Sequence, residues 1–454
     1  MSSERTEAAS RLVGVRAVVL GLGRFGGGLG AARYLAERGA SVVVTDREEA
    51  DRLQASVAKL ADLPGVTLRL GGHDETDFRR AELVVVNPAV KPDHPMLAVA
   101  REAGARVTTE IGLLIERLPD RRRVIGVTGT AGKSTVSAMI AHALTRATPD
   151  PVRLGGNLGG SLLPVVDDLG PADRVVLELS SFMLHYLRPM AWSPGVAVVT
   201  NFAPNHLDWH GSLAAYRDEK AELLAHQRES EGDAAVLGPG VRSGFDAKVS
   251  RVVDVGVDAG DQSGVELLVP GRHNRVNAQL AAAALEAATG IDRAAALDAL
   301  GDFPGLPHRL QLVVEHHGVR FFNDSKATTP DAAMQAIESF EPGTVHAILG
   351  GYDKGSDLTP LARHAAARCA AIYTLGQTGE AIAEAARAAP ASAARVTRCD
   401  SLEAAVAAAV EAARAGTVVL LSPGCASWGM FEDYERRGEA FTESVLRWAT
   451  ETGA

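Results

Sequence analysis

A glycine-rich segment with one lysine and two hydroxyl residues carries the clearest chemistry in this chain. Residues 126–135 read GVTGTAGKST. Such a turn offers backbone N–H groups, a fixed cation and hydroxyls to an anion at a helix N-terminus, as a phosphate-binding loop does. The glycines stand three residues apart, and Val127 occupies the place where the usual loop has its first glycine. We expect Lys133 to contact the terminal phosphates of a nucleoside triphosphate and Ser134 to bind Mg²⁺.

A second glycine-rich turn lies near the N-terminus and supports a competing hypothesis. It reads GLGRFGGG over residues 21–28, and Asp46 follows Gly26 by 20 positions. This spacing is typical of a dinucleotide fingerprint, which favours an NAD-dependent oxidoreductase. A turn of this geometry equally suits another nucleotide diphosphate, which helix N-terminal N–H groups bind without regard to nicotinamide. The third interpretation is a tight turn between a strand and a helix with no ligand. Because nicotinamide chemistry has no use for Lys133 or Ser134, a nucleotide-linked substrate together with ATP accounts better for both loops.

An acid and an imidazole follow two further predicted strands. Glu178 lies in LELSSF, and His206 lies in TNFAPNHLDWHGS. Beside Ser134 they could hold one or two Mg²⁺ ions, although a lone Glu or His is more often structural. The roles of Asp208 and His210 in the same loop stay open between these two interpretations. Lys220 in AYRDEKAELL lies on a predicted helix, where a solvated lysine is the simpler interpretation.

Further polar residues at turns suit a phosphorylated nucleotide. GRHNRVNA predicts a helix start at which Asn274 and Asn277 either cap the helix or bind a base or ribose. Arg309 in LPHRLQ is a cation able to bridge phosphates as charge moves between them.

The C-terminal third carries a set of residues that suits a small dicarboxylate. Asp324 ends a predicted strand, and Lys326 lies in the turn after it. Lys354 in GGYDKGSD is a second cation, and a pair of lysines favours a dicarboxylate over a neutral substrate. Ser427 follows the strand in SPGCAS.

The elements that position these residues predict an α/β fold. Short β-branched runs alternate with Ala- and Leu-rich stretches, which is typical of parallel sheets covered by helices on both faces. Predicted strands span residues 17–23, 41–46, 82–87, 124–129, 175–180, 196–201, 319–324, 345–351, 371–376 and 417–424. Most end in small polar residues, and ligands of parallel sheets collect at the carboxyl ends of strands. Helices over 276–288 and 401–413 are expected to serve packing.

Two proline-containing breaks divide the chain. ERLPDRRR and GDFPGLPHR indicate three domains, near residues 1–111, 112–305 and 306–454. A chain of 454 residues exceeds what one hydrophobic core usually serves.

Composition excludes some classes of protein. The formal net charge of −10 argues against a general nucleic-acid or membrane-surface binder. Cys369, Cys399 and Cys425 are widely spaced, which suits reduced thiols in the cytosol. Apolar runs stay shorter than the ~18 residues of a membrane span, and the first residues lack the apolar core of a signal peptide. We therefore expect a cytoplasmic protein without membrane insertion.

Taken together, the motifs resemble the Mur ligase family over nearly the whole chain. The segments concerned are GTAGKST, GGNLG, LELSSF, HLDWHGS, GRHNRVNA, GLPHR, NDSKAT, GGYDKG and LLSPGCAS. The family loop Gly-Thr-x-Gly-Lys-Ser/Thr accounts for the unusual glycine spacing. GLPHR, NDSKAT and SPGCAS are most similar to the D-glutamate-adding branch, and the Asp-Asn-Pro-Arg motif of the ligase acting next is missing from the sequence. Another Mur-type ligase is an alternative, as is a folylpolyglutamate synthetase-like ligase, although the latter would not need the N-terminal fingerprint.

The resemblance implies a three-domain enzyme of peptidoglycan and cell wall synthesis, a process linked to cell shape, cell division and the cell cycle. A Rossmann-like N-terminal domain would bind UDP, a central P-loop ATPase-like domain ATP, and a Rossmann-like C-terminal domain the amino acid. The expected reaction ligates D-glutamate to UDP-N-acetylmuramoyl-L-alanine through an acyl phosphate and releases ADP and phosphate. ATP and two Mg²⁺ ions are the expected cofactors, with Mn²⁺ able to substitute. The partners would be small molecules, and the protein a monomer.

The resemblance also assigns roles to individual residues by motif. Catalytic roles go to Lys133, Glu178, His206, Lys220 and Arg309. ATP would be bound by Gly129, Thr130, Ala131, Gly132, Lys133, Ser134, Thr135, Asn274, Arg309 and Asp324. The UDP substrate would be bound by Gly23, Phe25, Gly26, Asp46, Arg47, Asn87, Ala89, Asn157 and Ser181. D-Glutamate would be bound by Lys326, Thr328, Lys354, Ser427 and Tyr434. The metal ligands would be Ser134, Glu178, His206 and a carbamylated Lys220.

The sequence departs from the family pattern at several of these positions. Phe25 stands where Ser or Thr commonly contacts UDP, and Asn87-Pro88-Ala89 replaces a common Ser-Pro-Gly. Asn205 precedes His206 where an acid is frequent, and Tyr434 stands where Phe is common.

Overall fold

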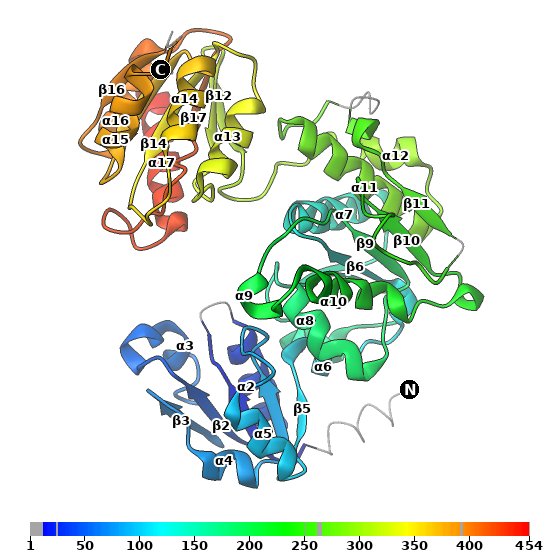
Figure 1. The fold of residues 1–454 in the computed structure, drawn as a ribbon. Coiled ribbons are helices and arrows are strands. Elements are labelled where there is room, and N and C mark those ends of the chain that lie inside the picture. Colours follow the sequence, from blue (N-terminus) through cyan, green and yellow to red (C-terminus); the bar gives the residue numbers. More distant parts are fainter. Residues whose placement is uncertain (1–11, 24–25, 250, 261–265, 391–393, 454) are drawn as a thin grey trace. The chain divides into compact units, whose positions relative to one another are not determined.

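The structure is a computed structural model that describes residues 12–23, 26–249, 251–260, 266–390 and 394–453. The chain forms two compact units, one of Met1–Ala259 with Val276–Ala299 and the other of Gly260–Arg275 with Leu300–Ala454. The described residues form three sheets, two in the first unit and one in the second (Figure 1). The predicted α/β class is confirmed. The domain boundaries at 111 and 305 stay a prediction.

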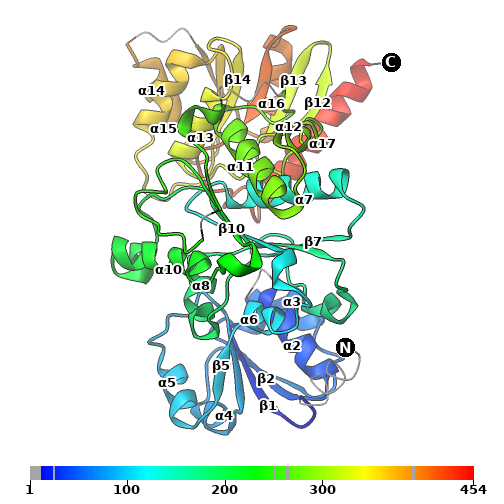
Figure 2. The same ribbon diagram turned by 90° about the vertical axis from the view of Figure 1, so that its right-hand side faces the viewer.

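The N-terminal sheet is parallel throughout, and its chain order reverses at the centre. Its strands, in spatial order, are β3 (Val66–Leu70), β2 (Ser41–Asp46), β1 (Arg16–Leu20), β4 (Leu83–Val86) and β5 (Arg106–Thr108). Alternate residues of β1 face opposite sides, as the period of a strand requires. Val19 packs in one core with α2 (Gly27–Glu37), and Val18 packs in another with α4 (Glu75–Arg80) and α5 (Pro95–Glu102). The ribbons of these helices beside β1 and β2 can be followed in Figure 2. The order reversal between β1 and β4 opens a crevice at their carboxyl ends.

The central sheet is also parallel. Its spatial order is β11 (Val252–Asp254), β10 (Ala234–Leu237), β9 (Val196–Val199), β6 (Val124–Thr128), β8 (Arg174–Glu178) and β7 (Val152–Gly156). The helices are α6 (Glu110–Ile115), α7 (Lys133–Ala147), α8 (Ser181–Leu187), α9 (Leu207–His210), α10 (Leu213–Ala225), α11 (Arg272–Thr289) and α12 (Arg293–Asp298). The apolar side chains of α8 and α10 pack with β6, β8 and β9 in one core. The carboxyl ends of β8, β6 and β9 therefore lie side by side.

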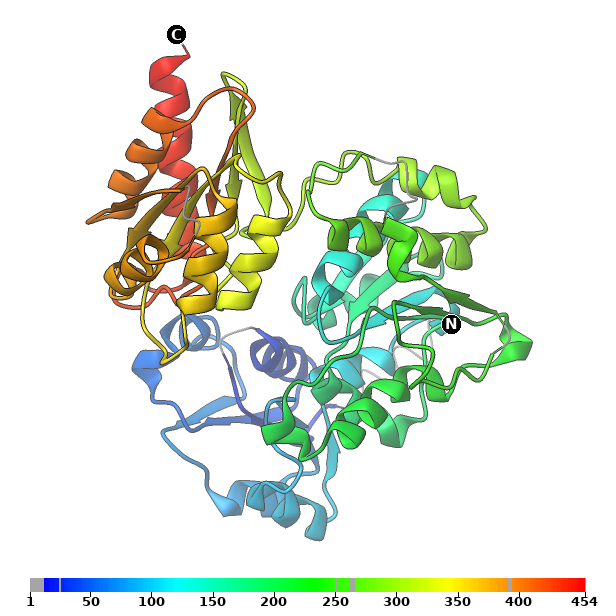
Figure 3. The same ribbon diagram turned by 45° about the horizontal axis from the view of Figure 1, so that its top comes forward.

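The sheet of the second unit is mixed. Its order is β12 (Gln311–His316), β13 (Val319–Asn323), β17 (Val418–Leu421), β14 (Val345–Gly350), β15 (Ala371–Leu375) and β16 (Arg395–Arg398), and only the β12–β13 pair is antiparallel among the described strands. One face packs against α13 (Pro330–Glu338), α14 (Thr359–Arg368) and α15 (Gly379–Arg387). The other face packs against α16 (Leu402–Ala412) and α17 (Tyr434–Thr452), the red helix of Figure 3.

All ten predicted strands form in the structure, whereas seven others were missed. The missed strands are β3, β5, β7, β10, β11, β12 and β16. Several are short or lie at sheet edges, such as the three residues of β11 and the polar RVTR of β16. Edge strands bury less surface and so show weaker apolar periodicity. Among the described helices, none is both long and apolar enough to cross a membrane.

Candidate functional site

The phosphate loop connects the end of β6 to the start of α7. Gly129 and Gly132 have φ of 148° and 78°, a region that side chains with a Cβ rarely adopt. Gly132 is the N-cap of α7, and no side chain caps the helix there. The first-turn N–H groups of a 15-residue helix are thus directed at the loop, which is the geometry of an anion site.

The turn after β9 holds this loop in shape. Asn201 accepts a hydrogen bond from Ala131 N–H through Oδ1 at 2.9 Å and donates one to the Ala131 carbonyl through Nδ2 at 3.0 Å. The Thr200 hydroxyl donates to the same carbonyl at 2.6 Å. The Thr130 hydroxyl donates to the Ala203 carbonyl at 3.1 Å. Sequence reasoning missed Asn201 as a residue that holds the loop, because nothing in TNFAPNH indicates a partner 70 residues earlier.

Two lysines converge on one carbonyl of the loop. Lys133 Nζ donates to Gly129 O and to Thr130 O, both at 3.0 Å. Lys220 Nζ donates to the same Gly129 O at 2.7 Å, and Lys220 is only 1% exposed. Burial, followed by the charge of Lys133, lowers the pKa of Lys220 to about 6. The interpretation of Lys220 as a solvated lysine is therefore wrong, and its amine is largely uncharged at neutral pH.

Glu178 ends β8 as a buried carboxylate that is only partly satisfied. Its Oε1 accepts a hydrogen bond from Asn157 Nδ2 at 3.0 Å. Its Oε2 has no hydrogen-bond partner among the residues that the structure describes. A buried carboxylate oxygen with open lone pairs is a typical ligand for a hard cation. Asn157, predicted to bind substrate, here orients Glu178.

His206 lies at the N-cap of α9 with a positive φ of 52°. Burial, followed by the charges of Lys133 and Lys220, lowers the pKa of its imidazole. The neutral imidazole is the form that binds a metal. In the described part of the chain, no three His, Cys, Asp or Glu side chains converge as a metal site. A divalent ion here would therefore need Ser134 or a new carboxylate on Lys220 in addition to Glu178 and His206.

The Ser181 hydroxyl and the His210 imidazole lie within hydrogen-bond distance of each other. The Ser181 hydroxyl lies 3.0 Å from His210 Nε2, and the His210 ring stacks on Phe182 at an interplanar angle of 6°. Burial lowers the pKa of His210 to about 4. The sequence left both metal binding and a structural role open for His210, and this geometry favours the structural role.

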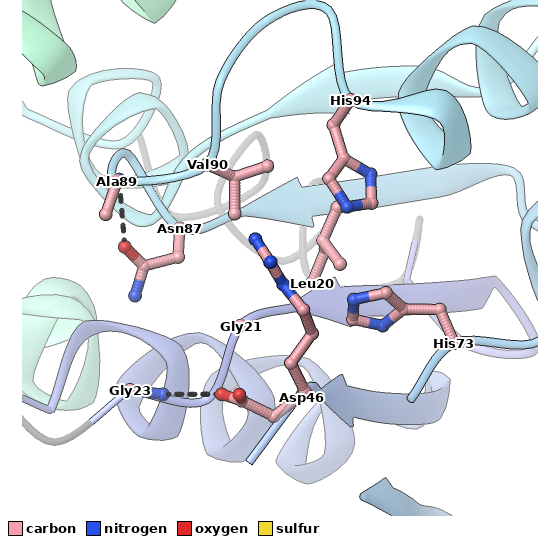
Figure 4. A pocket seen from close by; sticks show the side chains of 10 residues that line it. Leu20, Gly21, Gly23, Asp46, His73, Asn87, Ala89, Val90 and His94 are labelled. Carbon is pink, nitrogen blue, oxygen red and sulfur yellow. Dashed lines mark hydrogen bonds between the residues drawn. The ribbon is translucent and has the colours of Figure 1, made fainter. Parts of the chain in front are cut away.

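A cavity of about 230 Å³ lies at the carboxyl ends of β1, β2 and β4 (Figure 4). Five predicted UDP-binding residues line it, namely Gly23, Asp46, Arg47, Asn87 and Ala89. Gly26 is the N-cap of α2 with φ of 89°. Phe25 lies outside the described residues. His73 and His94 also line the cavity, and sequence reasoning missed both. β3, the strand that ends three residues before His73, was among the missed strands, so no predicted strand end pointed to this residue.

In the second unit, two residues that are predicted to bind ATP, Asn274 and Asp324, form hydrogen bonds with neighbouring residues. Asn274 Nδ2 donates to the Pro270 carbonyl at 2.7 Å. Asp324 accepts hydrogen bonds from Leu310 N–H at 3.1 Å and from the Ser422 hydroxyl at 2.7 Å. Burial raises the pKa of Asp324 to about 7, which these hydrogen bonds and the charge of Arg309 oppose.

The residues predicted to bind D-glutamate follow β13, β14 and β17. Lys326 Nζ lies 5.2 Å from the centre of the Tyr434 ring, and Lys354 Nζ lies 4.6 Å from the Trp428 ring. The Thr328 N–H donates to the Lys326 carbonyl at 2.9 Å.

Arg437 joins two of these turns. Its buried guanidinium donates to the Ser325 carbonyl at 2.8 Å and to the Cys425 carbonyl at 3.0 Å. The turns that contain Lys326 and the 4% exposed Ser427 are therefore held together. Arg437 was missed because its partners lie 112 and 12 residues away.

Comparison with known proteins gives matches over most of the chain. The MurD-like N-terminal domain of Mur ligases matches residues 15–109, the Mur ligase middle domain 127–238, and the Mur ligase glutamate ligase domain 308–425. A UDP-N-acetylmuramoylalanine–D-glutamate ligase of Roseiflexus sp. is 39% identical, covering 96% of this chain and 99% of the relative. The protein of that name from Pelotomaculum thermopropionicum is 38% identical, covering 95% and 97%. These matches confirm the predicted three-domain arrangement.

Solved structures share the fold at low sequence identity. A MurF ligase from Thermotoga maritima in complex with ADP has a TM-score of 0.53 at 16% identity, covering 90% of this chain and 96% of that chain. A folylpolyglutamate synthase of Mycobacterium tuberculosis complexed with ADP has a TM-score of 0.51 at 18% identity, covering 74% and 94%.

The clamp of Asn201 on the phosphate loop gives a first prediction. Asn201→Asp replaces a donating amide by a carboxylate oxygen that faces the Ala131 carbonyl, so the loop loses one hydrogen bond and gains a repulsion. We expect the Kd for ATP, measured by calorimetry, to rise at least about tenfold. Gln54→Glu makes the same amide-to-carboxylate change at an exposed residue of α3 (Gln54–Ala58) in the same unit, and it is the matched control. Equal affinities for all three proteins would contradict the clamp.

The buried carboxyl of Asp324 gives a second prediction. Because its pKa is raised to about 7, the folded chain keeps a proton that the unfolded chain releases above pH ~4. Stability from this residue is therefore lost as pH rises from about 4 to 7. The urea midpoint of Asp324→Asn, relative to that of the original chain, should rise over this range. A difference that is constant with pH would show that Asp324 is ionised in the fold.

Proposed function

This chain belongs to the Mur ligase family, and we propose that it joins D-glutamate to UDP-N-acetylmuramoyl-L-alanine with conversion of ATP to ADP and phosphate. The observation that carries this proposal is the near full-length match to D-glutamate ligases at 32–39% identity. The glycine-rich loop of β6–α7 supports it, because this geometry binds a triphosphate.

A carboxylate must be activated before it can form an amide. In the proposed first step a carboxylate oxygen of the L-alanine group attacks the terminal phosphorus of ATP, the new O–P bond forms, and ADP leaves. In the second step the amine of D-glutamate attacks the acyl carbon, loses a proton, and the tetrahedral intermediate expels phosphate. Negative charge accumulates on phosphate oxygens in both steps, so fixed cations and N–H donors lower the barrier.

In this proposal the loop residues and Lys133 hold the triphosphate, and Arg309 offsets the charge that moves between phosphates. Asn274 and Asp324 would contact the rest of the nucleotide. Mg²⁺ would be held by Ser134, Glu178 and His206, and it would neutralise charge on the triphosphate. Within the described part of the chain, Oε2 of buried Glu178 has no hydrogen-bond partner, which supports a cation at this place.

Lys220 is proposed to carry a carbamate. A neutral amine adds to CO₂ and releases a proton, which replaces a potential cation by a carboxylate. The pKa of about 6 and the 1% exposure of Lys220 support this step, because the reactive form of the amine is populated at neutral pH. A carboxylate beside Lys133 would also remove the repulsion between the two amines.

The other predicted site residues are proposed to bind the UDP end of the first substrate and the D-glutamate. The UDP end would occupy the cavity lined by Gly23, Asp46, Arg47, Asn87 and Ala89. The residues Lys326, Thr328, Lys354, Ser427 and Tyr434 would bind the carboxylates of D-glutamate. We further propose that the protein acts as a cytoplasmic monomer.

Substrate selectivity tests the proposed function. Phosphate release from ATP, measured with UDP-N-acetylmuramoyl-L-alanine, should occur with D-glutamate, and not with L-glutamate, L-lysine or meso-diaminopimelate. The reason is that two cations placed for the two carboxylates of D-glutamate fit L-glutamate, L-lysine and meso-diaminopimelate poorly. Turnover with one of the other amino acids alone would contradict the D-glutamate assignment. Tight binding of NADH without ATP-dependent turnover would instead favour an oxidoreductase.

Substitution of Lys220 tests the carbamate. Lys220→Ala should lower kcat by about 100-fold or more, because a positioning charge at the triphosphate is lost. Added acetate or another short carboxylic acid should restore part of the rate by supplying a carboxylate in the space left. Lys248→Ala removes an exposed lysine of the same unit and serves as the control with an unchanged rate. Full activity of Lys220→Ala without added acid would refute the carbamate.

A further inference from the structure

Two histidines of the cavity in the first unit have no role in the proposal above. His73 follows β3, and His94 is the N-cap of α5. Their ring centroids lie 5.4 Å apart at an interplanar angle of 79°. In Figure 4 both imidazoles are directed toward one another on the same side of the cavity. Both contribute to the lining, so a ligand that fills the cavity meets both rings.

The hydrogen bonds of His73 determine which of its ring nitrogens carries the proton. Its Nδ1 lies 2.7 Å from Thr45 Oγ1. The same hydroxyl donates its only proton to the Gly72 carbonyl at 2.8 Å, and a carbonyl can only accept. Thr45 Oγ1 must therefore accept from His73 Nδ1–H. In the neutral ring, Nε2 of His73 then carries a lone pair and is an acceptor.

The hydrogen bond of His94 determines the opposite tautomer. Its Nδ1 accepts from the N–H of Met96 at 3.3 Å, as an N-cap side chain does. A ring nitrogen that accepts has no proton, so the proton of the neutral ring is on Nε2. Burial lowers the pKa of both imidazoles, with the charge of Arg47 acting in the same direction, so both are neutral at neutral pH.

The two rings therefore offer one acceptor and one donor side by side. Among the described residues, no hydrogen-bond partner occupies either Nε2. An acceptor nitrogen needs a ligand that donates, which an ionised diphosphate cannot do. The imide edge of uracil has an N–H next to a carbonyl, which is the complement of this pair. Cytosine has the reverse pattern at the same edge, a bare nitrogen next to an amino group.

We infer that His73 and His94 recognise the base of the UDP-linked substrate, with His73 Nε2 accepting the uracil N3–H and His94 Nε2–H donating to the adjacent carbonyl. This inference rests on the proposed UDP-linked substrate and identifies the residues that read its base. It assigns the diphosphate to the glycine-rich turn, of which Gly21 and Gly23 line the cavity and Gly26 is the N-cap of α2. His73 and His94 thus determine specificity and do not take part in the ligation.

The test compares binding of UDP, CDP and 2′-deoxy-UDP to the full chain by calorimetry. UDP should bind about 100-fold more tightly than CDP, since each of two mismatched polar pairs costs roughly tenfold. The deoxynucleotide should bind within about threefold of UDP, because the pair reads the base and not the ribose.

Two variants separate the acceptor from the donor. His73→Phe keeps a ring but removes the acceptor, and His94→Asn keeps a side-chain acceptor for Met96 N–H while removing the donor. Each should weaken UDP binding about 3- to 10-fold and leave CDP binding unchanged, so the UDP/CDP ratio falls. His317→Asn, at a φ of 50° that Asn tolerates, is the matched control in the other unit.

Several outcomes would overturn the inference. Equal binding of UDP and CDP, or none by either, would do so without any variant. A UDP/CDP affinity ratio that stays unchanged in both variants would also overturn the inference. Binding of 2′-deoxy-UDP as weak as that of CDP would overturn it too, because the ribose would then lie at the histidines. Failure of the ligation assay is a separate result, because UDP can be read selectively by a chain that releases no phosphate from ATP.

Discussion

Two lysine amines that share the carbonyl of Gly129 are the constraint around which the central site is built. Two ammonium groups this close repel each other, so burial and the neighbouring charge displace the proton from Lys220 and leave Lys133 as the cation. This arrangement requires the loop to keep its shape without a ligand. Asn201 supplies that shape from β9, and α10 brings Lys220 to the same point. In the proposed function, this fixed backbone presents its N–H groups to the triphosphate, and Lys133 exchanges its two carbonyl partners for phosphate oxygens.

The same unit links this site to the nucleotide cavity through a short segment. Asn87, Ala89 and Val90 line the cavity, and three hydrogen bonds to backbone carbonyls connect the segment 87–91 to the region of the phosphate site. Trp209 Nε1 donates to Ala89 O at 3.3 Å, the Tyr186 hydroxyl donates to Val90 O at 2.8 Å, and Lys91 Nζ donates to Asp208 O at 2.8 Å. The segment that carries His206 is therefore bonded to the segment that would contact UDP. Such contacts offer a physical route by which occupancy of the cavity affects the phosphate site.

Much of the fold was readable from the sequence because buried parallel strands are continuous apolar runs, and all ten such runs form strands. The phosphate loop and the helix positions of Asn274 and Lys220 were likewise readable from local patterns. Asn201, His73 and Arg437 were not, because each acts through partners distant in sequence. The tautomer of His73, for example, depends on Thr45, which is 28 residues away. The lowered pKa of Lys220 depends on burial, and the weakly amphipathic sequence of its helix does not reveal that burial.

The central claim is that the phosphate loop serves to activate a carboxylate. Its most direct test uses UDP-N-acetylmuramoyl-L-alanine labelled with oxygen-18 in the alanine carboxylate, incubated with the chain, ATP and D-glutamate. Mass spectrometry of the released phosphate should find a single labelled oxygen in each molecule, because the oxygen that attacks phosphorus leaves with it. Phosphate that carries no label, released together with the amide product, would contradict an acyl phosphate and the account built on it.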